Sequence, residues 1–238
     1  VFAMLVGRVQ GTRASLHVAN NAGTRATRRL RHAQRIRTMT GLGFDVPIVS
    51  VIIPTRNPQA ERITQTLAGL AAQRLPPSAW ETVLVDNGSE PPLPATMLAS
   101  LPSEQRLVRE GSAGLTPARV AGISAARGEV LVFVDDDNVL DPGYLSAAAG
   151  FFAERPDLGA AGGPVVPEWA TPPPPWTREF HGLLALRDLG PKAKIAKGSM
   201  NAPWPDFAPV GAGLVVRRSH ALAYAEAVAR DPRRSRLD

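Results

Sequence analysis

The stretch VLVFVDDDN (Val130–Asn138) decides the fold, because five consecutive apolar residues are followed at once by three aspartates. A short apolar run rich in β-branched residues is typical of a strand covered on both faces, as in a parallel sheet. Adjacent carboxylates repel and raise one another's pKa unless a cation neutralises them. Because ligands bind beyond the carboxyl ends of the strands in such sheets, the stretch predicts an α/β protein with a charged site at one edge.

Predicted strands and helices alternate around this stretch. Strands are expected at Ile48–Ile53, Thr82–Val85, Arg106–Val108, Val130–Val134 and Gly211–Val216. Helices are expected around Ile63–Leu70, over Thr116–Arg127 before Gly128, after an Asp141 N-cap with Pro142 at the first helical position, and over Ser219–Arg230. This order predicts a doubly wound, mostly parallel sheet with right-handed crossovers.

Charge and composition divide the chain into three parts. Residues 1–46 hold eight arginines against the single acid Asp45, which leaves 19 basic and 20 acidic groups in residues 47–238. We expect residues 1–46 to be a flexible or partly helical basic tail, because so polar a segment buries little apolar surface. An α/β domain is expected at 47–165. A looser segment with prolines, tryptophans and lysines follows at 166–238.

Several classes of function are excluded by composition. The chain has no cysteine, which excludes disulfides, cysteine zinc sites and thiol catalysis, so a metal is expected to sit on oxygen. No apolar run reaches the length of a membrane span, and we expect a cytoplasmic protein. The basic tail leaves peripheral contact with the inner face of the cell membrane open.

Polar residues follow the predicted strands where a ligand would bind. They are Thr55 and Asn57, then Asp86, then Asp135–Asn138. Side chains alternate in extended backbone, so we expect Asp135 and Asp137 to face the same way and to hold Mg²⁺ or Mn²⁺. A solvated acidic turn is the alternative. Asp86 opens a common turn sequence but could accept a nucleobase N–H, and Arg119 is either a surface arginine or a phosphate contact.

The motifs together resemble the inverting glycosyltransferases of family 2, which have the GT-A fold. The resemblance covers about 170 residues and rests on five motifs: VSVIIPTRN (Val49–Asn57), LVDNGS (Leu84–Ser89), AGLTPARVAGISAARGEVLVFVDDDN (Ala113–Asn138), GPVVPEW (Gly163–Trp169) and PVGAGLVVRR (Pro209–Arg218). It implies a Rossmann-like nucleotide-diphospho-sugar transferase, in which residues 47–165 form the nucleotide-sugar-binding domain and residues 166–238 form a partial acceptor side.

Site roles follow from the resemblance, position by position. It implies that the nucleotide is contacted by Pro54, Thr55, Asn57, Asp86, Arg119, Asp135 and Asp136, with Asp86 holding the base. Asp137 would be the main Mn²⁺ or Mg²⁺ ligand, with Asp135 beside it. Trp169 and Trp176 either stack on acceptor sugar rings or anchor loops.

The implied reaction transfers a sugar, from a UDP-sugar by expectation, to a glycan or lipid-linked acceptor with inversion, in polysaccharide biosynthesis for the cell envelope. The family takes its catalytic base from a later acidic motif, which we expect beyond Asp238, in a sequence truncated at its end. A binding-only fragment is the main alternative. Nucleic-acid binding through the arginine tail would show a steep salt dependence, and no nucleic-acid partner is expected.

Overall fold

The computed structural model describes residues 2–6, 46–169, 171–184, 186, 193–198, 205–231 and 233. The strands are β1 (Phe2–Val6), β2 (Val49–Thr55), β3 (Trp80–Asp86), β4 (Glu104–Arg109), β5 (Val130–Phe133), β6 (Leu158–Gly162), β7 (Lys194–Gly198) and β8 (Leu214–Arg217). The α-helices are α2 (Ala60–Ala71), α3 (Leu115–Ala125), α4 (Tyr144–Glu154) and α5 (Arg218–Arg230). The 3₁₀ helices are η1 (Pro77–Ala79), η2 (Ala95–Leu98) and η3 (Pro175–Leu183).

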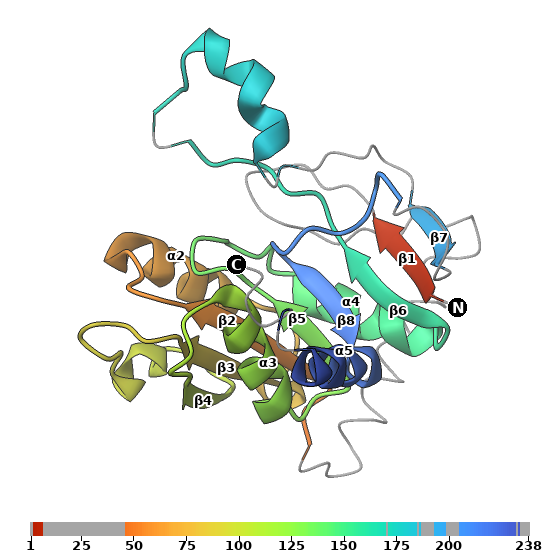
Figure 1. Cartoon of the computed structure of the whole chain (residues 1–238), viewed down its shortest axis with the longest axis horizontal. Helices are drawn as coiled ribbons and strands as arrows, with labels where there is room; N and C mark the ends of the chain where they lie inside the picture. Colours follow the sequence, from red (N-terminus) through yellow and green to blue (C-terminus); the bar gives the residue numbers. More distant parts are fainter. Residues whose placement is uncertain are drawn as a thin grey trace.

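The described strands form one sheet in the order β4-β3-β2-β5-β8-β6-β1-β7 (Figure 1). β4, β3, β2 and β5 are parallel neighbours, and β6 and β1 are parallel to each other. β8 runs antiparallel to both β5 and β6, and β7 runs antiparallel to β1. The predicted mostly parallel α/β sheet is therefore confirmed, and β5 and β6 point the same way.

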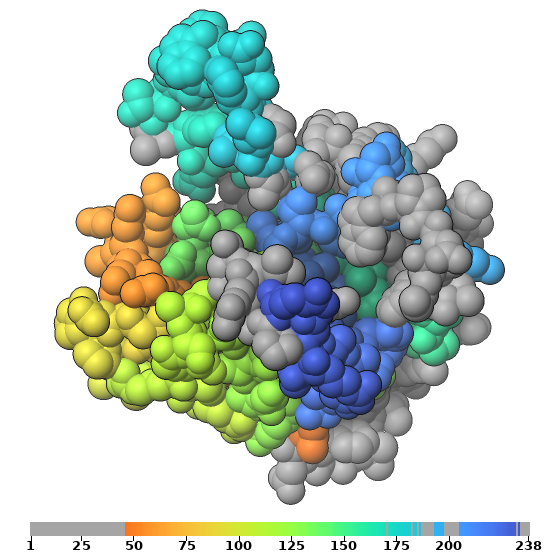
Figure 2. All heavy atoms as spheres, in the orientation of Figure 1, coloured from red at the N-terminus to blue at the C-terminus, as the bar shows by residue number. Residues whose placement is uncertain are grey.

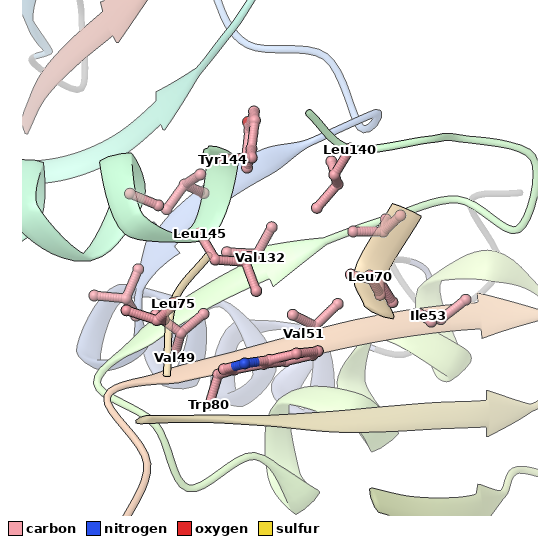
Figure 3. Close-up of a cluster of buried hydrophobic side chains, with 14 of the residues drawn as sticks. Val49, Val51, Ile53, Leu70, Leu75, Trp80, Val132, Leu140, Tyr144 and Leu145 are labelled. Carbon is pink, nitrogen blue, oxygen red and sulfur yellow. The ribbon is translucent and has the colours of Figure 1, made fainter. Parts of the chain in front are cut away.

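Two hydrophobic cores cover the two faces of the sheet. Val51 belongs to the cluster that includes the buried residues of α2 and α4, part of which is drawn in Figure 3. Its neighbour Ile52 points to the other face, where it packs with α3 and α5. Successive strand residues face opposite sides, so a strand that is apolar at every position needs cover on both. This confirms the doubly wound prediction.

Some predicted boundaries are wrong. α4 begins at Tyr144, and Asp141 is not its N-cap: the Asp141 Oδ1 accepts a hydrogen bond from the Gly143 amide at 2.8 Å and closes a turn before the helix. The last predicted strand was placed too early, because residues 211–213 form a turn and β8 starts at Leu214.

Two segments in which no strand was predicted each form one. Phe2–Val6 forms β1 beside β6, so the prediction of a flexible or partly helical tail is wrong for these residues. Lys194–Gly198, in the looser segment after residue 165, forms β7 and pairs with β1. The rest of the predicted tail, residues 7–45, lies outside the described residues.

A charged network joins the strands at the amino edge of the sheet. Glu81 is 1% exposed and accepts hydrogen bonds from the Ser50 hydroxyl at 2.6 Å, from the Arg127 amide at 2.7 Å and from the Arg127 Nε at 3.0 Å. Burial raises the pKa of Glu81, but these hydrogen bonds and the Arg127 charge outweigh it and leave the pKa below its ordinary value. The network therefore stabilises the ionised carboxylate.

We predict that Glu81→Gln lowers the free energy of unfolding by about 2–3 kcal/mol, since buried donors lose their charged acceptor. Glu104→Gln is the matched control, because Glu104 binds the same Arg127 but its side chain is 56% exposed, and we expect a loss below about 1 kcal/mol. Urea unfolding measures both.

The contribution of Glu81 to the free energy of unfolding should also depend on pH. Because its folded pKa lies below the unfolded value, the stabilisation is present above the unfolded pKa and is lost as the pH falls through the folded one. The difference between wild type and Glu81→Gln should therefore shrink in acid. Equal losses for Glu81→Gln and Glu104→Gln at neutral pH would contradict this account.

Candidate nucleotide and metal site

The structure brings the predicted strand-end residues to one edge of the sheet. Thr55 and Asp86 are opposite partners at the ends of β2 and β3. β5 lies on the other side of β2, and the Val134 amide donates to the Ile52 carbonyl at 3.0 Å just before the aspartates. Pro54 is buried beyond the last β2–β5 pair, so its missing N–H breaks no ladder bond with β5.

The three aspartates do not lie along an extended strand. The backbone turns at Asp136 and Asp137, and the Asn138 amide donates to the Asp135 carbonyl at 3.1 Å. The expectation that Asp135 and Asp137 face the same way is therefore wrong. It assumed that strand geometry continues past Val134, whereas β5 ends at Phe133.

Each carboxylate meets a partner from a different element. Asp135 lies 4.0 Å from the Arg119 Nη2 on α3. Asp136 accepts a hydrogen bond from the Thr55 hydroxyl at the end of β2. Asp137 lies 3.7 Å from the Arg62 Nη1 on α2. Sequence reasoning missed Arg62, whose position one helix away carries no local signal.

The pKa of Asp135 is raised above its ordinary value. Burial is the main cause that raises the pKa of its carboxyl; the Arg119 charge opposes this rise, and the charges of Asp137 and Asp136 add to it. Positive charge from the protein therefore compensates the cluster incompletely. A divalent cation or a second guanidinium contact would relieve the remaining repulsion.

The donor set fits a hard divalent cation with few protein ligands. Among the described residues, no three histidine, cysteine or acidic side chains form a metal cluster. Mg²⁺ and Mn²⁺ at nucleotide sites often take only one or two carboxylates, the rest being water and phosphate oxygens. Among the described residues, Asp137 has a 3.7 Å contact with Arg62 and a hydrogen bond from Asn138 at 3.2 Å. Its side chain is 46% exposed, and it is the exposed member of the three aspartates.

Arg119 is held close to the cluster by a tightly packed turn. Its guanidinium lies 5.8 Å from the centre of the Phe133 ring, and its Nε is buried without a hydrogen-bond partner among the described residues. A Cβ at Gly211 would lie only 2.6 Å from the Arg119 Nη2. A glycine at 211 therefore lets the turn approach the arginine.

Asp86 is turned into the protein. It is 2% exposed, and its oxygens accept hydrogen bonds from the Ser89 amide at 2.9 Å, the Leu93 amide at 3.0 Å and the Arg109 Nη1 at 3.0 Å. Burial raises the pKa of Asp86, but the bonds from Ser89 and Leu93 and the Arg109 charge bring it below its ordinary value. This geometry favours positioning of the loop over direct contact with a base.

Asn57 and Asn87 also tie loops together at this edge. Asn57, in the left-handed region at φ 48°, donates its amide to the Ser89 hydroxyl and accepts from the Glu90 amide at 2.8 Å. Asn87 donates to the Ser112 carbonyl at 2.6 Å and accepts from the Gly114 amide at 2.8 Å. Asn87 and Arg109 were missed in the sequence, although Asn87 directly follows Asp86.

The two tryptophans predicted as acceptor contacts lie apart from the aspartates in the chain, in the segment after β6. Trp169 is 42% exposed and its ring lies 5.4 Å from that of His181, and Trp176 on η3 is 66% exposed. Acceptor contact by either residue stays a prediction. No described helix is long and apolar enough to cross a membrane.

Comparison with known proteins identifies the region that carries this site. The family Glycosyl transferase family 2 matches residues 50–221. A glucosyl-dolichyl phosphate glucuronosyltransferase of Haloferax volcanii is 26% identical over 146 residues, which is 60% of this chain and 46% of that protein. Glycosyltransferase AglE of the same organism is 34% identical over 95 residues, or 39% of this chain and 31% of that protein.

Solved structures show a partial likeness. The mannosyltransferase PcManGT from Pyrobaculum calidifontis, in complex with GDP-Man and Mn²⁺, is 27% identical with a TM-score of 0.40, over 55% of this chain and 41% of that one. S. aureus TarS in complex with UDP is 30% identical with a TM-score of 0.37, over 45% and 32%. This chain thus covers less than half the length of each of these relatives.

Two substitutions should move the pKa of Asp135 in opposite directions. Arg119→Gln removes the charge that lowers this pKa, so the pKa should rise. Asp137→Asn removes a charge that raises it, so the pKa should fall. Carboxyl-detected NMR titration measures both, with Asp157 as an internal control because its partner is Arg155. Shifts of the same sign would contradict the arrangement.

Proposed function

Because this chain belongs to glycosyl transferase family 2, we propose that it binds a nucleotide-diphospho-sugar, with UDP-sugars as the expected class, and carries the donor side of a glycosyltransferase. The carboxylate cluster of Asp135–Asp137 at the carboxyl edge of the sheet carries this proposal. Its incompletely compensated negative charge lies where α/β sheets bind ligands.

In this proposal the diphosphate lies between the cluster and Arg119. Asp137 would hold Mn²⁺ or Mg²⁺, and the cation would supply positive charge against the diphosphate. Asp135, predicted as a second ligand, faces Arg119 and would add negative charge beside the ion. The Arg119 side chain is 26% exposed, and its guanidinium can donate to a phosphate oxygen. Asp136, anchored by Thr55, faces the ribose.

The nucleoside occupies the edge formed by the β2 and β3 loops. Pro54, Thr55 and Asn57 contact the nucleoside in our proposal, which is supported by their position at the end of β2. Asp86 contributes by holding the loop from Ser89 to Leu93, through the hydrogen bonds that occupy its oxygens. Direct contact between Asp86 and the base would require these bonds to rearrange.

The proposed reaction is an inverting displacement at the anomeric carbon. An acceptor hydroxyl oxygen forms the new bond to this carbon while the bond to the diphosphate oxygen breaks, and a carboxylate base takes the hydroxyl proton. We assign no such base among the described residues. A lipid-linked acceptor is favoured over a free glycan, since one relative is named for action on a dolichyl phosphate.

Asp137→Ala should weaken Mn²⁺-dependent UDP binding at least tenfold, about 1.4 kcal/mol, because the most accessible carboxylate of the cluster is lost. Isothermal titration calorimetry with and without Mn²⁺ measures the effect. Asp157→Ala is the control: Asp157 is an exposed aspartate paired with Arg155, and its loss should leave the affinity unchanged. The same UDP affinity in Asp137→Ala as in wild type would refute the metal assignment.

A binding-only protein is the second candidate, since we assign no catalytic base among the residues that the structure describes. It predicts that the purified chain binds UDP with Mn²⁺ but releases no UDP from UDP-sugars beyond the rate of spontaneous hydrolysis, with or without lipid-linked acceptors. A coupled assay for released UDP measures this. Acceptor-dependent release that disappears in Asp137→Ala would exclude the binding-only alternative.

A further inference from the structure

A buried tyrosine at the start of α4 holds the turn that precedes β8. Tyr144 is 1% exposed, and its hydroxyl donates a hydrogen bond to the buried Gly213 carbonyl. Burial raises the pKa of this hydroxyl, so it keeps its proton and stays a donor. A buried carbonyl that lost its donor would be left unsatisfied, which makes this bond a strong constraint on the position of Gly213.

Both polar groups of Gly213 fix the turn at residues 211–213. While the carbonyl accepts from Tyr144, the Gly213 amide donates to the Phe133 carbonyl at the end of β5, at 3.0 Å. The Leu214 amide donates to the Gly211 carbonyl at 3.2 Å and closes the turn. The turn is therefore tied to α4 on one side and, on the other, to the strand that leads to the aspartates.

This turn packs against the guanidinium of Arg119. A Cβ at Gly211 would lie 2.6 Å from the Arg119 Nη2 and 3.9 Å from the Asp135 Oδ2. Arg119 itself comes from α3 and reaches Asp135 only at 4.0 Å. So long an ion pair leaves a flexible side chain several rotamers, whereas backbone packed against the Nη2 restricts them. The direction of the guanidinium therefore depends on where the turn lies.

Tyr144 is in turn held by the residues that follow α2. The Arg74 amide donates to the Pro142 carbonyl at 2.8 Å, and the Leu145 amide donates to the Gln73 Oε1 at 3.0 Å. In Figure 2 the residues after β5 (green) lie between α2 (orange) and the residues before β8 (blue). Tyr144 therefore connects two parts of the molecule, the segment after α2 and the turn before β8.

We propose that Tyr144 is a positioning residue for the donor site and acts on Arg119 through the turn at residues 211–213. Because it is buried, it does not contact the ligand itself. Its hydroxyl fixes Gly213, and the turn places Gly211 against the Arg119 guanidinium, which is thereby kept directed at the aspartate cluster. The inference rests on the proposed function, in which Arg119 contacts the diphosphate.

The test compares Tyr144→Phe with wild type in calorimetry of UDP with Mn²⁺. Loss of the hydroxyl releases the turn, so we expect the UDP affinity to fall about fivefold or more, because the Arg119 guanidinium loses its fixed direction. Thr82→Val is the matched control: it also removes one buried hydroxyl, hydrogen-bonded to Ser103 at 3.4 Å near the amino end of β3. It should bind UDP like wild type.

A double variant separates positioning from a general loss of stability. If Tyr144 acts through Arg119, Tyr144→Phe lowers the UDP affinity no further in an Arg119→Gln background. Gly211→Ala supplies a second route to the same effect. Its Cβ meets the far end of a flexible side chain, so the protein should stay folded while Arg119 moves and the UDP affinity falls. Thermal unfolding of every variant is measured alongside.

A measurement without nucleotide keeps this inference separate from the proposed function. The Arg119 Nε is buried without a hydrogen-bond partner among the described residues, so packing protects its proton from exchange with water. NMR should show faster exchange of this proton in Tyr144→Phe and no change in Thr82→Val. If wild type binds no UDP, the proposed function fails and the exchange rate decides the inference. Unchanged exchange in Tyr144→Phe, or additive losses of UDP affinity in the double variant, would overturn it.

Discussion

The carboxylates of Asp135, Asp136 and Asp137 stand together where β5 leaves a core that excludes water, and their mutual repulsion has to be compensated there. The compensation comes from three elements that surround the strand end: α3 supplies Arg119, β2 supplies Thr55 and α2 supplies Arg62. None of these contacts neutralises the cluster fully. The remaining charge makes this edge suited to bind a cation and a diphosphate.

At the amino edge of the sheet, a buried carboxylate is compensated in a different way. Glu81 is more deeply buried than Asp135, yet its pKa is lowered because hydrogen bonds from Ser50 and Arg127 satisfy the carboxylate within the protein. The pKa of Asp135 is raised. The carboxylate at the amino edge is therefore satisfied within the protein and stabilises the fold. The carboxylates at the carboxyl edge keep negative charge that, in the proposed function, a bound ligand compensates.

Local patterns predicted the fold, and they predicted that polar strand-end residues gather at one edge of the sheet. The apolar run before Asp135 predicted a strand covered on both faces, and the spacing of Ile63, Leu67 and Leu70 predicted α2. The contacts within the site were less predictable, because they depend on partners distant in sequence. Asp86 was predicted to contact the base, whereas its bond to Arg109, 23 residues away, and its burial favour a positioning role.

The sequence by itself determined that this is a mostly parallel α/β protein with three aspartates at the carboxyl edge, because residue periodicity and strand-end position are local properties. Only the tertiary structure decided where each carboxylate points, since the turn at Asp136 and Asp137 depends on contacts from three separate elements. It also decided that Trp176 and Leu183 stay exposed. Burial depends on what packs against a residue, and no local pattern records that.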